Sequence, residues 1–342
     1  MKQRRGPILV VGLVLSIAFV ALSLRHVDLH GLGDALGHSH WWPWYVLAPT
    51  IYLAGHVVRG VRCRTILRPH CDLNLITATN CTVIGYGANN LLPARMGEFV
   101  RAYVLGRQAG VPVSLALAIT FLERILDGLT ITGILLVAGL FAPLPDWGRE
   151  LRWAAGLVFA SATIAVALIT AARPFVLRVA QLVTARLPLA LDRRITAILN
   201  RAFGATDCLR DPILTIKIVA LSLTVWIVEG GMFLVVLPAF DLPMNPLWAA
   251  MALSVTNLGI LIPSSPGYIG PFHYFCMQAL QIFGVPADTA LGYAIMVHLL
   301  YYVPITIWGV GALTAYGVSL GTAAQTVPAP ALAVATENEV LR

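Results

Sequence analysis

Charged side chains interrupt an apolar stretch at residues 113–140, which is long enough to cross a bilayer. Glu123 and Asp127 are four residues apart and share one helix face, and Arg124 is close enough along the helix to pair with Asp127. A charge in hydrocarbon costs at least about 2.5–3.5 kcal/mol, so such residues need a partner or a water-filled cavity. Two interpretations follow: a binding site for charged cargo, or an internal ion-pair cluster that only holds helices together.

A second group of charged residues lies in and just after a Pro- and Gly-containing break in the helical pattern at Asn90–Glu98. Its members are Arg95, Glu98 and Arg101. Gly97 permits a tight turn, so a helix is expected to begin there with its free N–H groups pointing into the membrane. Arg95 beside those groups would complete a site for phosphate or carboxylate, because a guanidinium holds two oxygens at once. The alternative is that Arg95 and Arg101 reach out to the cytoplasmic interface.

A similar break occurs about half a chain later. The segment 93–97 reads P-x-x-x-G and is followed by Gly110-Val111-Pro112, while 263–267 reads the same way and is followed by Gly284-Val285-Pro286. Matching Pro and Gly interruptions in two halves of a membrane protein point to the binding site of a transporter-like fold.

The second break carries no charge. We expect a neutral site for an anion or a polar head group there, because hydroxyls and close backbone approach are available; the alternative is an ordinary extracellular turn. The candidate residues are Ser264, Ser265, Gly267 and Gly270.

Three further features carry less weight. Glu229 lies in the middle of the apolar run 214–238, where pairing with an arginine and carrying a proton are equally good interpretations. His298 aligns with Arg124 in the G-V-P register, and a hydrogen-bonded core histidine is favoured over a titrating one. The His and Asp residues of the 25–42 loop and the five cysteines lack metal-ligand spacing, so no metal and no cofactor are predicted.

Composition places the chain in a membrane. Hydrophobic residues make up 58% and charged residues 11%, against roughly 25% charged in soluble domains. The net charge of +7 is carried almost wholly by arginines that follow the loops, which is the positive-inside pattern and not a nucleic-acid surface.

We therefore predict an all-α polytopic membrane protein with about six transmembrane helices and two re-entrant helical hairpins. The predicted spans are 7–24, 43–61, 113–140, 153–172, 214–238 and 287–318, and the hairpins are 75–108 and 247–283. The alternative is that each hairpin contains full spans.

Arginine placement puts both termini in the cytoplasm and makes the repeat halves 75–140 and 247–318 antiparallel. Span two is expected to end at the cytoplasmic face with four arginines: Arg59, Arg62, Arg64 and Arg68. We expect one membrane domain, 1–320, with a cytoplasmic basic loop at 173–212 and a disordered cytoplasmic tail at 321–342.

The residues quoted above also carry a family resemblance. The motifs Asn90-x-x-Pro93-x-Arg95-x-Gly97-Glu98-x-x-Arg101, Glu123-Arg124-x-x-Asp127 and Pro266-Gly267-x-Ile269-Gly270 resemble those of the lysylphosphatidylglycerol synthase transmembrane region, or flippase-like, family. The resemblance implies a plasma (inner) membrane protein related to the lipid-translocating half of that synthase. This chain departs at Tyr268, where a glycine is usual, and at His273, where an acid is expected. The aminoacyl-transfer domain is expected to be absent.

The predicted function is a lipid flippase that moves an anionic or lipid-linked head group between leaflets. No G-x-x-x-x-G-K-[ST] motif is present, so no ATPase is predicted, and transport would be passive or coupled to protons or membrane potential. The alternative is an intramembrane enzyme, or an accessory subunit acting on a polyprenyl-phosphate or phospholipid substrate with a separate glycosyltransferase or lipid-modifying enzyme. Nucleic acid is not expected as a partner.

Overall fold

The computed structural model describes residues 5–25, 27–93, 95–143, 146–184, 200, 203–262 and 264–318, and all regular elements in these ranges are helical. The longer helices are α1 (Arg5–Leu24), α3 (Trp44–Leu67), α6 (Val113–Phe141), α7 (Asp146–Thr184), α9 (Pro212–Val236) and α12 (Ala287–Ala315). The shorter helices are α2 (Leu29–Gly37), α4 (Leu75–Leu91), α5 (Gly97–Ala109), α10 (Pro246–Gly259) and α11 (Pro271–Gln281). The same described ranges also contain the 3-10 turns η2 (Asp207–Arg210), η3 (Leu237–Phe240) and η4 (Pro266–Tyr268).

By length and composition, three helical segments of the described chain could cross a membrane, namely Val113–Phe141, Pro212–Phe240 and Ala287–Ala315. Segments Val10–Leu24 and Leu29–Gly37 together form a fourth candidate, bent by 87°. The all-α membrane fold is therefore confirmed, while the count of six spans stays a prediction.

Helix α7 extends further than the predicted fourth span. It runs for 39 residues to Thr184, so helix occupies the first part of the stretch predicted as the basic loop 173–212. Residues 185–199 and 201–202 of that stretch, and the predicted tail 321–342, lie outside the described residues.

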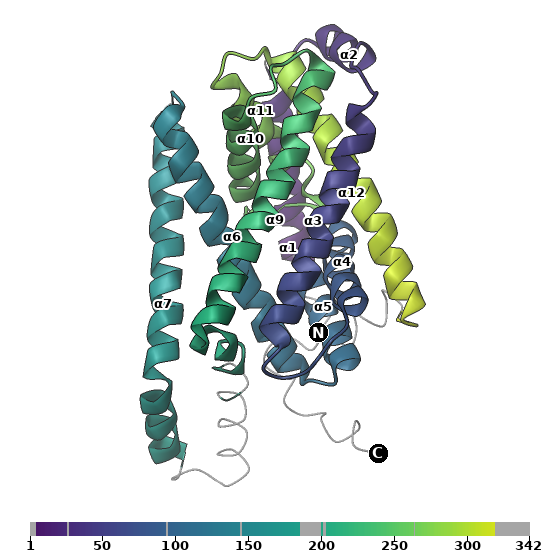
Figure 1. Ribbon diagram of the computed structural model, residues 1–342. Helices are drawn as coiled ribbons and strands as arrows, with labels where there is room; N and C mark the ends of the chain where they lie inside the picture. The colour runs from purple at the N-terminus through teal and green to yellow at the C-terminus, as the bar shows by residue number, and fades with distance from the viewer. Residues whose placement is uncertain are drawn as a thin grey trace.

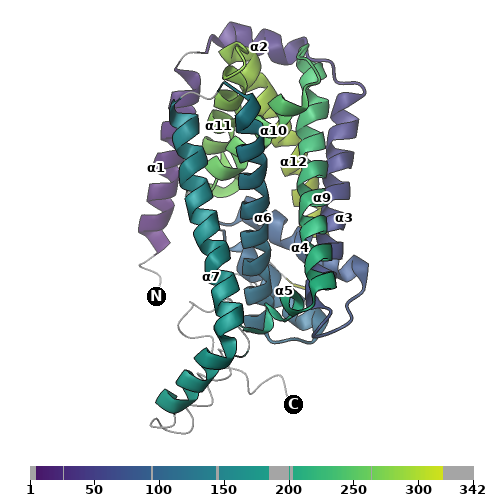
Figure 2. The same ribbon diagram turned by 60° about the vertical axis from the view of Figure 1, so that its left-hand side comes forward.

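Two short helical hairpins enter the bundle from opposite ends. Figures 1 and 2 show α4 and α5 in the lower half and α10 and α11 in the upper half, with their turns facing each other. The longest arm, α4, has 17 residues and the shortest, α11, has 11. At 1.5 Å per residue none of the arms covers the roughly 30 Å of a hydrocarbon core, which favours the predicted re-entrant hairpins over full spans.

The starts of these helices follow from local sequence. Asn74 caps α4 by accepting from the Thr77 N–H at 2.7 Å, and Asn245 caps α10 by accepting from the Leu247 N–H at 2.8 Å. Proline at the first helical position opens both α10 and α11, where its missing N–H costs nothing.

The turns of the two hairpins share an unusual backbone conformation. Arg95 has φ of 53° and Tyr268 has φ of 60°, the left-handed region that side chains rarely adopt. Each lies two residues after a proline and two before the glycine at the start of the next helix. The structural equivalence is therefore 93–97 with 266–270, three residues later than the sequence motif 263–267 predicts.

Gly97 lets the two arms of the first hairpin meet. A Cβ at this position would overlap the Gly85 carbonyl oxygen and Asn89 of α4. The Gly97 N–H donates to Oδ1 of Asn89 at 2.8 Å, which fixes the start of α5 against α4.

The substitution Gly97→Ala is expected to lower the free energy of unfolding by about 1–3 kcal/mol, because the added methyl has no room without moving the backbone. Thermal unfolding in detergent measures this change. The matched control is Gly133→Ala in α6, where no atom lies within 4 Å of the new Cβ. Equal stability of the two variants would contradict the close approach.

Candidate functional site

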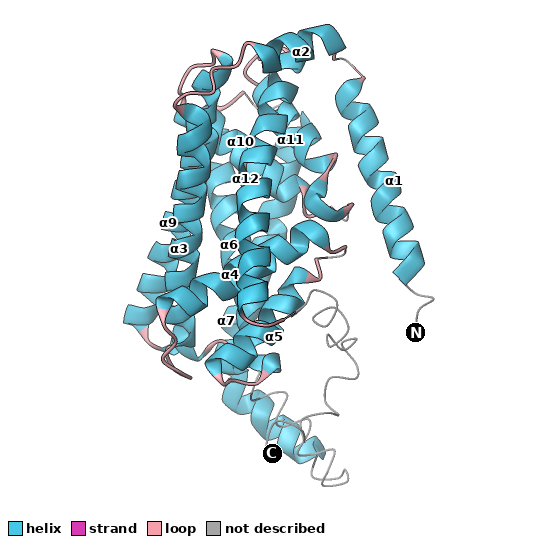
Figure 3. Cartoon of the chain, turned by 90° about the vertical axis from the view of Figure 1, so that its right-hand side faces the viewer, coloured by secondary structure: helices cyan, strands magenta, loops and turns pink. Residues whose placement is uncertain are grey.

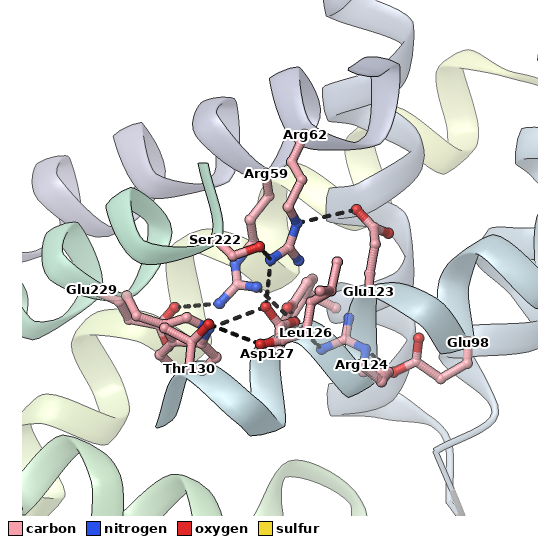
Figure 4. A network of polar contacts seen from close by, with 12 residues as sticks. Arg59, Arg62, Glu98, Glu123, Arg124, Leu126, Asp127, Thr130, Ser222 and Glu229 are labelled. Atoms are coloured by element: carbon pink, nitrogen blue, oxygen red, sulfur yellow. Dashed lines mark hydrogen bonds and ion pairs between the residues drawn. The ribbon is translucent and has the colours of Figure 1, made fainter. Parts of the chain in front are cut away.

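Buried charges of α3 and α6 converge on Asp127, whose exposed fraction is 3%. Its carboxylate pairs with Arg59 at 3.1 Å, Arg62 at 2.7 Å and Arg124 at 3.4 Å. The indole N–H of Trp226, from α9, donates to it at 3.1 Å. Figure 4 shows Asp127 between the guanidinium groups, so one carboxylate connects three helices.

Further carboxylates surround this centre. The remaining ion pairs of the group are Arg59–Glu229 at 2.6 Å, Arg62–Glu123 at 3.5 Å, Arg124–Glu98 at 3.2 Å and Arg101–Glu123. A buried ion pair is stable only when its other donors and acceptors are also used. Several are, since Arg62 also donates to Ser222 at 3.1 Å and Arg124 to the Tyr86 hydroxyl at 2.9 Å.

The placement of Arg59 and Arg62 corrects the sequence analysis, which puts both at the cytoplasmic interface. Their exposed fractions are 2% and 1%, whereas the Arg64 side chain is 48% exposed. The reason is helix geometry: Arg59 and Arg62 are three residues apart and so share the face of α3 that meets α6 and α9. That three-residue spacing is visible in the sequence, but it does not identify the helices that cover this face.

A cavity of about 300 Å³ opens beside this network. Five of the predicted site residues line it: Arg95, Glu98, Arg124, Asp127 and Glu229. Most of the remaining wall is aromatic or apolar, and its rings come from Tyr52, Tyr86, Phe121, Phe159, Trp226, Phe233, Tyr268, Phe272 and Tyr301. A mostly apolar pocket with a few converging polar groups is the usual form of a ligand site.

Arg101 and Glu123 lie elsewhere. Each is 1% exposed, they pair with each other, and neither belongs to the described residues that line the cavity. Their positions favour the interpretation as an internal ion-pair cluster over direct contact with cargo.

The neutral residues of the second turn pack against α1 and α12. The Ser265 N–H donates to Oγ of Ser16 at 2.8 Å, and Gly270 lies against the Ser16 carbonyl. A Cβ on Gly267 would meet the ring of Tyr302 at 2.7 Å. Ser264 Oγ is buried with no hydrogen bond among the described residues.

The turn nevertheless reaches the cavity through Tyr268, a residue that the sequence analysis treats only as a departure from a motif. Figure 3 shows helix α1 standing beside the bundle, next to the hairpin turns.

The N-terminus of α5 does not present the free N–H groups that the sequence analysis expects. Gly97 N–H donates to Asn89, Glu98 N–H to the Arg95 carbonyl at 3.2 Å, and Phe99 N–H to the Met96 carbonyl at 3.1 Å. With these donors occupied, side chains must supply the affinity for a ligand at this turn.

Arg95 is the arginine of this cluster that has no carboxylate partner within the described part of the chain. The cluster holds five arginines (Arg59, Arg62, Arg95, Arg101, Arg124) and four carboxylates (Glu98, Glu123, Asp127, Glu229), an excess of one positive charge. Among the described residues no carboxylate lies within ion-pair distance of Arg95. Its guanidinium donates to the Ile260 carbonyl at 2.8 Å and lies 5.6 Å from the centre of the Tyr268 ring.

The contacts of Arg95 join the turns of the two hairpins. Ile260 directly follows α10 and Tyr268 belongs to the second turn, so the one cation of the cluster without an acidic partner lies where the hairpins meet. Tyr302 of α12 adds a neutral contact by donating to the Asn90 carbonyl at 3.3 Å.

Comparison with known proteins adds a family. Residues 9–309 match the family described as the lysylphosphatidylglycerol synthase TM region. The chain is 27% identical over 356 residues to the glycosyltransferase AglD of Haloferax volcanii, covering 94% of this chain and 56% of that protein. It is 22% identical over 224 residues to the UPF0104 membrane protein MJ1078 of Methanocaldococcus jannaschii, covering 65% of this chain and 90% of that protein. This chain therefore spans little more than half of AglD, and no solved structure matches.

Proposed function

Because this chain belongs to the family of the lysylphosphatidylglycerol synthase TM region, we propose that it moves an anionic lipid head group between the two leaflets of a membrane. The observation that carries the proposal is the unneutralised guanidinium of Arg95, held where two re-entrant hairpins meet. Its counter-charge is the phosphate of the cargo.

The chemistry of the cavity supports a phosphate over a cationic head group. The carboxylates in the wall, Glu98, Asp127 and Glu229, are each bound to an arginine, so a cation would have to break a buried pair to gain a partner. An anion meets Arg95 at the cost of one neutral hydrogen bond to the Ile260 carbonyl. The aromatic wall lowers the local dielectric, which strengthens that attraction.

The arrangement of the hairpins supports passage across the bilayer. Each hairpin reaches about half way from its own end, and inverted repeats of this kind alternate access by rocking one repeat against the other. The head group would pass Arg95 while its lipid tail stays in the hydrocarbon. The family points to the plasma membrane as the location, and the distribution of arginines favours both termini in the cytoplasm.

A second candidate function rests on the similarity to a protein named as a glycosyltransferase. This chain would then present a lipid-linked sugar to a separate transferase. Intramembrane catalysis by the chain itself is less favoured, because the cavity carboxylates are held by arginines and are not free to act as general bases.

The test is leaflet exchange in liposomes that contain the purified protein. Two fluorescent phospholipids with the same tails are compared, one with a phosphatidylglycerol head group and one with phosphatidylcholine, and a polyprenyl-phosphate sugar forms a third arm. We expect faster exchange of the anionic lipids than of the zwitterionic one and no exchange in empty vesicles. Exchange no faster than in empty vesicles for all three lipids would overturn the proposal. If purified protein moves no lipid but co-purifies with a transferase, the second candidate is favoured.

A further inference from the structure

The second hairpin holds a pair of histidines where the first holds an ion pair. In the first repeat, Glu98 in the first turn of α5 binds Arg124 of α6 at 3.2 Å. In the second repeat, His273 in the first turn of α11 contacts His298 of α12, with Nε2 and Nδ1 3.1 Å apart. His298 is the residue that aligns with Arg124 in the G-V-P register. The fixed charges of one repeat are thus replaced in the other by two groups that can gain a proton.

The hydrogen-bond pattern assigns the tautomers of the pair. The Gly270 N–H donates to Nδ1 of His273 at 3.4 Å, so this nitrogen carries no hydrogen. Nε2 of His273 is then the donor and Nδ1 of His298 the acceptor. Both rings are neutral in this arrangement. His298 Nε2 is buried and makes no hydrogen bond of normal geometry within the described chain.

The surroundings of the pair hold no compensating charge. The ring of His298 packs against Phe272 at 4.8 Å and against Tyr301 at 5.2 Å and Tyr302 at 5.5 Å between centres. Within the described ranges, no carboxylate lies within ion-pair distance of either histidine. A proton added here therefore creates a positive charge with no counter-ion in the protein.

The described helices packed around the histidine pair also bring no compensating negative charge to it. Helix α10 contains no titratable residue and α1 only Arg5, at its far end. Helix α3 approaches through Tyr52, whose ring lies 5.6 Å from that of Tyr301, and η4 contributes Tyr268. Helix α4 approaches through the Asn90 carbonyl, which accepts from Tyr302, and the carboxylate of α9, Glu229, is bound to Arg59.

We propose that His273 and His298 form a proton-binding site that couples uptake of one proton to occupation of the cavity by an anionic head group. The inference rests on the proposed function, since the head group supplies the counter-charge. Phe272 connects the two sites, because it lines the cavity and stacks on His298. Binding of proton and anion must then favour each other equally.

Proton uptake also changes the second turn. The atom that can take up the added proton is Nδ1 of His273. This nitrogen now accepts from the Gly270 N–H, and once it is protonated it becomes a donor. No covalent bond changes; one proton enters from water and returns to water when the head group leaves. The Gly270 N–H at the start of α11 then loses its acceptor.

The experiment measures exchange of fluorescent phosphatidylglycerol in liposomes as pH is varied. Burial without a counter-ion disfavours the charged form of both rings, so the wild-type rate is expected to rise about tenfold only as pH falls below about 6, the lower part of the ordinary histidine range. His298→Gln and His273→Gln should flatten the profile. The control is His38→Gln, an exposed histidine whose Nδ1 contacts the Asp34 carbonyl, and it should keep the wild-type profile.

A second measurement uses only the wild-type protein, so it does not depend on whether the histidine variants fold. Adding phosphatidylglycerol to wild-type protein in weakly buffered detergent should remove about one proton per protein from solution, detected with a pH-sensitive dye. A wild-type profile in His298→Gln, or no proton uptake by the wild type, overturns the inference and leaves the proposed function standing. Absence of wild-type exchange at every pH instead overturns the proposed function.

Discussion

Replacing Arg95 with glutamine is expected to slow leaflet exchange of phosphatidylglycerol about 10- to 100-fold, the effect of losing a charged hydrogen bond of about 1.5–3 kcal/mol. The reason is that Arg95 is the one arginine of the cluster without a carboxylate partner, so its charge is free to bind a phosphate. The rate in liposomes, measured with equal amounts of inserted protein, gives the result.

Folding should survive this change. No buried carboxylate loses its partner, and the shorter glutamine gives up only the bond to the Ile260 carbonyl and the contact with Tyr268. Arg95→Lys should retain part of the rate because it keeps the positive charge. It should not retain all of the rate, because lysine lacks the planar guanidinium that binds two oxygens at once. Arg64→Gln is the matched control, since that arginine is half exposed and pairs with Asp72 outside the cavity. Exchange at the wild-type rate in Arg95→Gln would refute the role of this residue.

The substitution Asp127→Asn is expected to destabilise the fold by about 3–5 kcal/mol, the usual cost of removing one partner from a buried ion pair. Asp127 binds Arg59, Arg62 and Arg124, and a neutral amide leaves these buried cations undercompensated. Thermal unfolding in detergent measures the loss.

The comparison for this prediction is Asp72→Asn. Asp72 is 90% exposed and pairs with Arg64 at the surface, so its loss should cost less than about 1 kcal/mol. Similar unfolding temperatures for the two variants would mean that the network around Asp127 contributes nothing specific to stability.

Local sequence predicted the hairpins well. Proline and glycine occur together at the break between the two arms, so the hairpin expected at 75–108 matches α4 and α5, which run from Leu75 to Ala109. The same signals were less reliable inside the second turn, because Pro263 and Pro266 both fit the motif and only the backbone angles of Tyr268 decide between them.

Long-range partners could not be predicted in this way. The positive-inside pattern counts arginines near helix ends and cannot tell which helices cover those ends, so Arg59 and Arg62 were placed at the interface and not beside Asp127. The partner of Arg101 was equally open. Its long side chain could pair with Glu98 on the same helix, with Glu123 on another helix or with cargo, and the sequence does not choose among them. Such choices depend on how helices far apart in the chain pack together.

The helices of the bundle are held together by contacts of two different strengths. Asp127 fastens α3, α6 and α9 together through charged bonds, and separating them costs several kcal/mol. Contacts between α4 and α12 are neutral, such as Asn90 with Thr306 at 2.8 Å, and each contributes about 1 kcal/mol. Loss of the charge at Asp127 would therefore loosen three helices at once, whereas loss of one α4–α12 hydrogen bond would weaken a single boundary.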